Sequence, residues 1–299
     1  MDKGILLDSG TNELEILEFR VGPNYYGINV AKVKEILSYR PLTPIPKADR
    51  RVEGVFMPRD ELISIIDLAE VLDLPKSPDI TKDMFIETNF NKINTGFHVH
   101  EILGINRFYW TDMRKPDPSV GDKGMEMAVG IVDIKGHLVI ILDFEKIMSE
   151  INPEISLKMS DIEHKKNRSR DESPIIIAED SDLLRKMITD CLVHSGYTNV
   201  TPTNDGQECW DLLKSFEADN SIKENVACVI TDIEMPRMDG HHLTKLIKDD
   251  EAFADIPVVI FSSIVNDSMI KKGESIGANA QISKPEIGKL VDTIDDLLR

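Results

Sequence analysis

Cysteine is scarce in this chain of 299 residues, which has only Cys191, Cys209 and Cys228. Their spacing forms neither a C-x-x-C pair nor another metal-binding pattern, and the apolar neighbours of Cys228 indicate a reduced thiol in a core. Long apolar runs are missing too, since none approaches the ~18 residues that a membrane-spanning helix needs. The segment at the start, Met-Asp-Lys-Gly-Ile-Leu-Leu-Asp, is too short and too acidic for a signal peptide. We therefore expect a cytoplasmic protein without direct membrane insertion.

Positive charge is also in short supply. The chain has 35 Lys and Arg against 53 Asp and Glu, and its formal net charge is −18. Residues 174–299 alone hold 12 basic and 23 acidic side chains, which gives that part a net charge of −11. Because such a surface repels polyanions, we expect no nucleic-acid partner. A transcriptional regulator would need a basic helix-turn-helix, and the sequence contains none.

The last third of the chain does contain four short apolar runs, each of which ends at a polar side chain. The runs 175–178, 227–231, 258–261 and 280–283 lead into Glu179 and Asp180, Asp232, Ser262, and Lys284, respectively. Short apolar runs separated by helical patterns are typical of buried parallel strands. Ligands of such sheets bind at the carboxyl ends of the strands. We therefore expect three carboxylates, a hydroxyl and an ammonium to converge on one pocket.

Three carboxylates in one pocket repel one another, and a divalent cation would remove that repulsion. Mg²⁺ prefers oxygen ligands and leaves coordination sites open to a phosphate. Asp232 is then a candidate nucleophile, because a carboxylate can accept a phosphoryl group as an acyl phosphate. Lys284 would neutralise the phosphoryl oxygens, and the Ser262 hydroxyl would bond to them.

These residues resemble the response-regulator receiver domains, and the match covers residues 174–299. Its strongest element is the run Asp232-Ile-Glu-Met-Pro-Arg-Met-Asp-Gly240, which follows the family's D-x-x-M-P-x-M-D-G loop. The resemblance implies a doubly wound α/β fold with strand order 2-1-3-4-5 and phosphorylation of Asp232. It implies Mg²⁺ ligands at Glu179, Asp180, Asp232 and the backbone carbonyl of Glu234, a switch hydroxyl at Ser262, and phosphate contact by Lys284.

The chain departs from the receiver pattern at two positions. Glu179 replaces the commoner Asp as the first acid of the pair. In the family this residue often acts on the ion through a water molecule, so one extra methylene group is tolerable there. Gln281 stands at the switch position where an aromatic side chain is common, so an aromatic switch in its usual form is not expected. The spacing Asp232-Ile-Glu234 also suits the strand-end D-x-D of dehalogenase-like phosphohydrolases. The Met-Pro-Arg-Met-Asp-Gly continuation favours a receiver instead.

The first half of the chain contains an internal repeat. Residues 54–72 align without gaps on residues 130–148, at an offset of 76, and a shorter pair around Gly27 and Gly96 precedes each copy. Both copies are rich in β-branched residues, which indicates two β-rich units, each a small curled barrel. Asp67 and Asp143 occupy equivalent positions and are expected to cap the short helices that follow.

This duplication resembles the CheW-like coupling domain, which is built from two SH3-like five-stranded barrels. The resemblance rests on Tyr26-Gly27-Ile28-Asn-Val30, Val33-Lys-Glu35-Ile36, Arg59 and Ile65-Ile66-Asp67-Leu68. It implies an adaptor without enzymatic activity that links chemoreceptor tips to the histidine kinase CheA. Val33, Glu35 and Arg59 lie at positions associated with such contacts; for Val33, a core position is an equal alternative, whereas Arg59 is expected to be exposed.

Four histidines offer no convincing metal site. His98 and His100 alternate along an expected strand but lack a third ligand nearby, so we interpret them as surface histidines. His241 and His242 follow Gly240 where a helix is expected to begin, and we interpret them as residues of a helix face.

The chain is thus expected to contain a coupling domain over residues 1–148, a charged linker over residues 149–173 and a receiver over residues 174–299. This combination resembles the CheV-type chemotaxis coupling proteins. It implies a scaffold that is recruited to receptor arrays, binds receptor tips and CheA, and responds to phosphorylation of Asp232, for adaptation or as a phosphate sink. The alternative is a phosphohydrolase, either receiver-regulated or dehalogenase-like, that uses Asp232.

Overall fold

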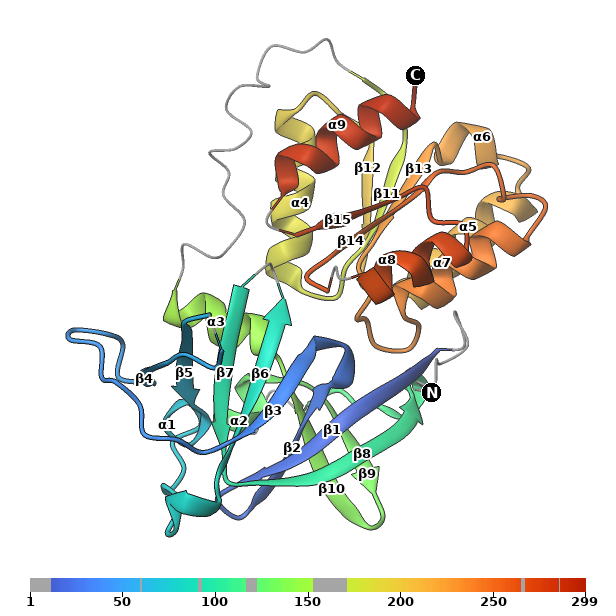
Figure 1. The fold of residues 1–299 in the computed structure, drawn as a ribbon. Coiled ribbons are helices and arrows are strands. Elements are labelled where there is room, and N and C mark those ends of the chain that lie inside the picture. Colours follow the sequence, from blue (N-terminus) through green and yellow to red (C-terminus); the bar gives the residue numbers. More distant parts are fainter. Residues whose placement is uncertain are drawn as a thin grey trace. The chain divides into compact units, whose positions relative to one another are not determined.

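The computed structural model describes residues 12–59, 61–90, 93–116, 123–152, 171–264, 267–284 and 286–299. Contacts within the chain divide it into two compact units (Figure 1). One unit, here called the N-terminal unit, spans Leu14–Ile155, and the other, the C-terminal unit, comprises Ser156–Arg299 together with Met1–Glu13. Among the helices of these described ranges, none is both long and apolar enough to cross a membrane.

The N-terminal unit is rich in strands. Its strands are β1 (Glu13–Val21), β2 (Asn24–Asn29), β3 (Val33–Ser38), β4 (Val52–Phe56), β5 (Ile63–Asp67), β6 (Met84–Phe90), β7 (Ile93–Val99), β8 (Glu101–Tyr109), β9 (Ala128–Ile134) and β10 (His137–Leu142). Its helices are α1 (Leu68–Val71), α2 (Lys123–Glu126) and α3 (Phe144–Ile151), with single 3₁₀ turns at Val30–Lys32, Ile80–Lys82 and Trp110–Asp112.

These strands form two five-stranded sheets, which agrees with the two five-stranded β units expected for a CheW-like domain. The strand orders are β8-β1-β2-β10-β9 and β3-β6-β7-β5-β4. The expectation that each copy of the repeat forms its own barrel is wrong, because each sheet combines strands from both copies. Strand β2 of the first copy lies parallel to β10 of the second, and β7 of the second lies parallel to β5 of the first.

Glycines accommodate isoleucines where strands of the two copies lie side by side. Gly27 on β2 lies opposite Ile141 on β10, and Gly96 on β7 lies opposite Ile65 on β5. A Cβ atom on Gly27 would lie 2.8 Å from Ile141 Cδ1, and one on Gly96 would lie 2.3 Å from Ile65 Cδ1. Ile65 and Ile141 are equivalent in the repeat. The glycine of one copy therefore makes room for the isoleucine of the other.

One aromatic side chain joins the two sheets. Phe144, at the start of α3, lies 6.4 Å from Phe19 on β1 and 4.6 Å from Phe97 on β7, measured between ring centroids. All three rings are fully buried, and edge-to-face packing of this kind stabilises cores beyond the area that it buries. Helix α3 begins there because the Asp143 carboxylate accepts a hydrogen bond from Lys146 N, as Asp67 does from Ala69 N at α1. Both predicted caps are thus confirmed.

The C-terminal unit is an α/β structure. Its strands are β11 (Ile175–Ala178), β12 (Val200–Thr203), β13 (Cys228–Thr231), β14 (Val258–Ser262) and β15 (Ala280–Ser283). Its helices are α4 (Asp182–His194), α5 (Gly206–Ala218), α6 (Ile222–Asn225), α7 (Gly240–Asp249), α8 (Asp267–Ser275) and α9 (Ile287–Leu297). The sheet is parallel with the order β12-β11-β13-β14-β15, which confirms the predicted order 2-1-3-4-5.

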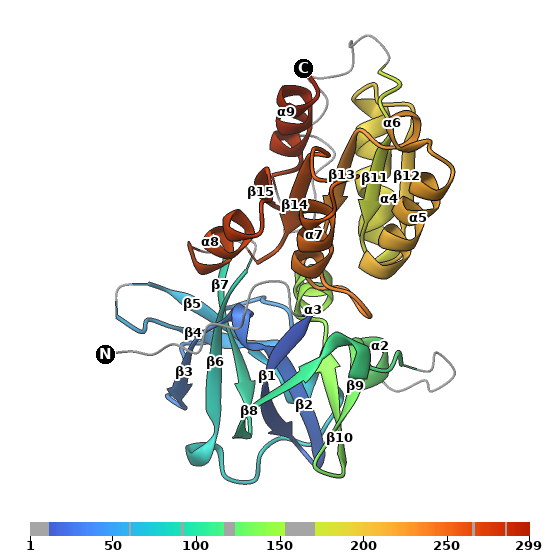
Figure 2. The same ribbon diagram turned by 90° about the vertical axis from the view of Figure 1, so that its right-hand side faces the viewer.

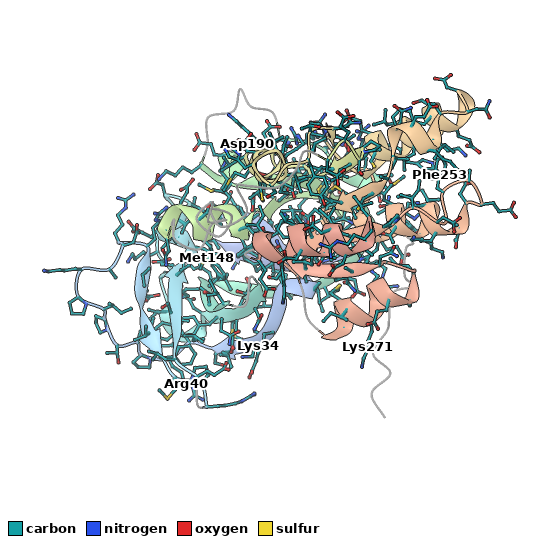
Figure 3. The ribbon with its side chains drawn as sticks, turned by 90° about the horizontal axis from the view of Figure 1, so that it is seen from above. Lys34, Arg40, Met148, Asp190, Phe253 and Lys271 are labelled. Carbon is teal, nitrogen blue, oxygen red and sulfur yellow. The ribbon has the colours of Figure 1, made fainter. Side chains whose placement is uncertain are left out.

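Helices cover both faces of this sheet (Figure 2). Side chains of β11 alternate between the two cores: Ile175 and Ile177 pack with α4 and α9, whereas Ile176 and Ala178 pack with α5 and α7. Burial on both faces explains why the strands are continuous apolar runs. Phe253, labelled in Figure 3, packs against Trp210 of α5 with 5.7 Å between ring centroids.

Ordered structure extends into both ends of the segment 149–173, which the sequence predicts as a linker. Helix α3 continues through Ile151, and Asp171 forms a β-bridge with Tyr197. The middle of the segment, residues 153–170, lies outside the described residues.

His98 is not the surface histidine that the sequence suggested, since only 6% of it is exposed. Its Nδ1 lies 2.8 Å from Glu53 Oε2, and its Nε2 lies 2.9 Å from Asp83 Oδ2. Burial alone would lower the pKa of His98, but hydrogen bonds to Glu53 and Asp83, together with the charges of Glu53 and Asp67, outweigh burial and raise it. With a carboxylate at each ring nitrogen, the imidazolium form can donate to both.

The His98 cluster predicts that the N-terminal unit loses stability as pH rises. A pKa raised above its unfolded value gives stabilisation that is complete below pH 6.5 and lost as pH rises through the folded pKa. His98→Gln should cost about 3 kcal/mol at pH 6, because removing one partner of a buried pair leaves the other charges unpaired, and much less at pH 9. Urea unfolding followed by buried Trp110, in a Trp210→Phe background, measures this. Equal losses at both pH values would contradict it.

His241 lies on helix α7, as predicted, and it is buried, with only 1% of the residue exposed. Burial, and secondarily the charge of Lys272, lowers the pKa of His241 to about 3. Among the described residues, its Nε2 atom has no hydrogen-bond partner.

The depressed pKa of His241 predicts acid sensitivity in the C-terminal unit. The unfolded chain takes up a proton at this histidine below pH 6.5, whereas the folded chain does so only near pH 3. Stability therefore falls by about 2 kcal/mol between pH 6.5 and pH 5. His241→Leu should remove that part of the pH dependence. Urea unfolding followed by Trp210 in a Trp110→Phe background measures it, and an unchanged slope against pH would refute the assignment.

Candidate functional site

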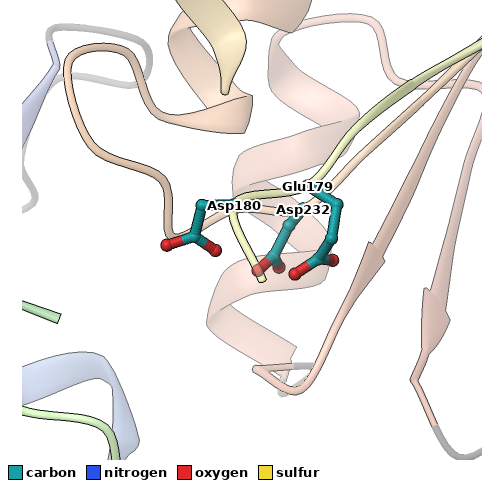
Figure 4. A group of neighbouring side chains, drawn as sticks. All are labelled: Glu179, Asp180 and Asp232. Carbon is teal, nitrogen blue, oxygen red and sulfur yellow. The ribbon is translucent and has the colours of Figure 1, made fainter. Parts of the chain in front are cut away.

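Three acidic side chains gather at the carboxyl edge of the C-terminal sheet. Glu179 and Asp180 follow β11, and Asp232 follows β13, its neighbour in the sheet. One carboxylate oxygen from each lies within 4.8 Å of those of the other two (Figure 4). Glu179 and Asp232 are almost fully buried, whereas Asp180 is half-buried. The convergence arises because adjacent parallel strands end at the same edge.

Lys284 supplies positive charge to this cluster. It follows β15, and its Nζ atom lies 2.8 Å from Asp232 Oδ2 and 3.1 Å from Glu179 Oε2. Only 4% of Lys284 is exposed, so its ion pairs are weakly screened by solvent. The ammonium offsets only part of the charge of three ionised carboxylates. Oxygen donors with a surplus of negative charge match the ligand preference of Mg²⁺.

The backbone around Asp232 fixes the direction of its carboxylate. Ile233 N donates a hydrogen bond of 2.7 Å to Asp232 Oδ1, and Thr231 Oγ1 donates to the carbonyl of Asp232. A Cβ atom on Gly240 would lie 1.8 Å from that carbonyl oxygen. Glycine is therefore required where α7 begins, because a larger residue would push the helix away from the strand end.

Ser262 lies at the same edge of the sheet. It ends β14, pairs with Ser283 on β15, and its carbonyl accepts a hydrogen bond of 3.1 Å from Lys284 N. The residue is fully buried, and its Oγ accepts from Ile264 N at 3.3 Å. The predicted hydroxyl and the predicted lysine are thus on neighbouring strand ends.

Gln281 makes its contacts with α8. Its Nε2 atom donates a 2.7 Å hydrogen bond to the carbonyl of Ile270, and its amide fills the space beside Gly273, where a Cβ atom would lie 2.3 Å from Nε2. The side chain at the predicted switch position is therefore bonded to a helix backbone. It links β15 to α8 by a polar contact where an aromatic ring would pack.

Two further predictions concern loop residues. Glu234 lies between β13 and α7, two residues after Asp232, and is half-buried. Its backbone carbonyl stays a predicted Mg²⁺ ligand. The resemblance to receivers also implies a cis peptide bond between Lys284 and Pro285, and Pro285 lies outside the described residues.

Sequence reasoning missed Arg185, which supports the acidic pair. Its Nη1 atom donates a 2.7 Å hydrogen bond to the carbonyl of Glu179, and its Nη2 atom contacts Asp182. Arg185 lies on the first turn of α4, six residues after Glu179. This short separation along the chain was the feature of the sequence that could have indicated the contact. The bond holds the backbone from which the two acidic side chains project.

The three residues predicted to bind partners lie in the N-terminal unit. Arg59 is in the β4–β5 turn with 75% of its side chain exposed, and its Nη2 lies 3.0 Å from Glu35 Oε2. Exposure of Arg59 is thus confirmed. Val33 begins β3, is partly buried and packs against the core.

Comparison with known proteins gives a consistent assignment for both halves. The family model of the CheW-like domain matches residues 15–152, and that of the response regulator receiver domain matches residues 175–295. The CheW protein of Thermotoga maritima is 28% identical over 48% of this chain and 94% of its own length. A CheY homologue of Campylobacter jejuni is 26% identical over 42% of this chain and 91% of its own length. These matches do not favour a phosphohydrolase.

Two of the relatives match this chain across both domains. The chemotaxis protein CheV3 of Helicobacter pylori is 30% identical over 97% of this chain and 96% of its own length. CheV1 of the same organism is 27% identical over 91% of this chain and 89% of its own length. The chain belongs to the CheV family of chemotaxis proteins, in which a CheW-like domain precedes a receiver domain.

Proposed function

We propose that this protein couples chemoreceptor tips to the histidine kinase CheA and that phosphorylation of Asp232 regulates the coupling. One observation carries the proposal: a buried Asp232–Lys284 pair with two further carboxylates stands in a chain that also has a CheW-like domain. The proposed organisation is a coupling domain over residues 1–148, a linker over residues 149–173 and a receiver over residues 174–299. The protein would act in the cytoplasm at receptor arrays, as an adaptor and not an enzyme.

The proposed reaction is phosphoryl transfer to a carboxylate. An Asp232 oxygen attacks the phosphorus of a phosphohistidine on the kinase, and an acyl phosphate forms. The phosphorus–nitrogen bond breaks, and the nitrogen keeps the electron pair and takes up a proton. Lys284, 2.8 Å from Asp232 Oδ2, is placed to neutralise charge on the transferred group. The hydrogen bond from Ile233 N holds the other carboxylate oxygen, so the attacking oxygen is oriented.

Mg²⁺ fits the donor set of this site. Glu179, Asp180 and Asp232 present oxygens within 4.8 Å of one another, and the Lys284 ammonium offsets part of their charge. We propose that Asp180, Asp232 and the carbonyl of Glu234 hold the ion, with Glu179 in an outer role. When bound, Mg²⁺ would supply positive charge to the phosphoryl oxygens.

The surface around Arg59 suits an adaptor. Its guanidinium is exposed and pairs with Glu35 of β3, so it can exchange this partner for a carboxylate or carbonyl of another protein. An exposed ion pair contributes about 0–1 kcal/mol to folding. We propose that Arg59 and Glu35 contact receptor or kinase, with Val33 supporting β3 beneath them.

Phosphorylation at Asp232 is tested by transfer of label from phosphorylated CheA in the presence of Mg²⁺. We expect label on the unaltered protein and none on Asp232→Ala, because the attacking oxygen is gone. Asp180→Asn should slow transfer and weaken its dependence on Mg²⁺. Asp255→Asn, an exposed carboxylate of the same domain, serves as the matched control and should behave like the parent. Transfer that persists in Asp232→Ala, or in EDTA, would overturn the assignment.

The adaptor role is tested by assembly of this protein with receptor tips and CheA. Arg59→Ala should weaken assembly about tenfold, which is typical for loss of an arginine anchor at an interface. The melting temperature should stay nearly unchanged because the Arg59–Glu35 pair is exposed. Lys82→Ala removes another cation of the domain, 81% exposed, and should not affect assembly. If Arg59→Ala unfolds the domain and binding follows the folded fraction, the contact role fails.

A further inference from the structure

Arg237 has a strained backbone in the loop that follows the phospho-acceptor. Met238 N donates a 2.8 Å hydrogen bond to the carbonyl of Pro236, which closes a three-residue turn around Arg237. The φ angle of Arg237 is +66°. A γ-turn with positive φ at its centre is rare and strained for any residue with a side chain. Strain of this kind persists only where neighbouring contacts hold it.

The turn lies within the loop that would supply a metal ligand. The loop runs from Asp232 to Gly240 and is closed by a 2.9 Å hydrogen bond from Gly240 N to the carbonyl of Ile233. Met235 and Met238 on either side of Arg237 are buried in the core beneath. The conformation at Arg237 therefore determines how the segment containing Glu234 is presented at the strand end.

Asp205 holds the Arg237 side chain in place. Arg237 Nε lies 2.7 Å from Asp205 Oδ2, and Nη2 contacts the same oxygen. Asp205 is 1% exposed, and its Oδ1 accepts a hydrogen bond of 3.0 Å from Glu208 N at the start of α5. A buried carboxylate is costly without a paired cation, so the ion pair favours the strained turn. It joins the acceptor loop to the turn between β12 and α5.

Gly206 permits this close approach. A Cβ atom there would lie 2.6 Å from the carbonyl oxygen of Met238, the residue after the strained position. Backbone packing and an ion pair thus act on the same three residues of the loop. Both come from residues 205 and 206, about 30 positions earlier in the chain.

We propose that Arg237 and Asp205 are positioning residues for the metal site: their ion pair offsets the strain of the turn and preorganises the Asp232–Gly240 loop for Mg²⁺. The inference rests on the proposed Mg²⁺ site and adds two residues that do not touch the ion. Loss of such supporting contacts typically weakens metal binding about 10- to 100-fold.

The test is Mg²⁺ affinity in the full chain, measured by calorimetry and by the shift in urea midpoint between EDTA and Mg²⁺, read from Trp210 in a Trp110→Phe background. Arg237→Ala should raise the dissociation constant about tenfold. Arg237→Lys should recover part of the affinity by restoring charge, and Arg237→Gly should recover part by relieving strain. Asp205→Asn should resemble Arg237→Ala while its amide oxygen still caps α5. Arg299→Ala, which removes an exposed arginine paired with Asp296 in the same domain, is the matched control and should bind normally.

The outcomes separate this inference from the proposed function. If the parent protein binds no Mg²⁺, both are overturned. If Asp180→Asn loses Mg²⁺ but Arg237→Ala binds like the parent, the metal site stands and the positioning role is overturned. A lower urea midpoint of Arg237→Ala in EDTA with unchanged Mg²⁺ affinity would show a structural contact only, and would also overturn it. Weaker binding with partial rescue by lysine and by glycine supports it.

Discussion

Repulsion among carboxylates at one edge of a parallel sheet is the constraint on which the C-terminal domain depends. Two unit charges 4 Å apart interact by about 4 kcal/mol at an effective dielectric constant of 20. Core packing outweighs this repulsion. The three carboxylates follow strands that are buried on both faces, and the ends of these strands cannot separate without loss of core packing. Lys284 reduces the repulsion, and its own burial ties the end of β15 to the ends of β11 and β13. The remaining negative charge would favour a cation at the proposed metal site.

The acid cluster could be predicted from the sequence because it depends only on the residues that stand at the ends of the apolar runs. Each acidic residue directly follows an apolar run, and parallel strands bring their ends together whatever the details of the helices. Burial of His98 and His241 could not be predicted in this way. His98 is held by Glu53 and Asp83, which lie 45 and 15 residues away in the chain, and the pattern of strand β7 itself gives no sign of them. The pairing of Arg237 with Asp205 could not be predicted either, because these residues lie 32 positions apart in the chain.

The repeat in the N-terminal domain shows a different limit. Equivalent residues were correctly aligned, and the capping roles of Asp67 and Asp143 followed from position alone. Which strand pairs with each repeated strand could not be predicted. A glycine on a strand indicates that a neighbouring group approaches closely, but it does not identify that neighbour. Both possible partners, the isoleucine of the same copy and that of the other, have the same shape. The sequence alone does not distinguish the two partners, and the structure shows that each glycine lies opposite the isoleucine of the other copy.

Exchange of strands between the two copies has a consequence for how this domain is made. Strand β2 cannot acquire its parallel neighbour until β10 exists, more than 100 residues later in the chain. Contacts of such long sequence separation slow folding, because the loop must close before they form. The first copy emerging from the ribosome therefore lacks a strand and exposes an edge. Neither copy of the repeat holds all the strands of one sheet, so we expect the domain to assemble as a single cooperative body once nearly all of it has been synthesised.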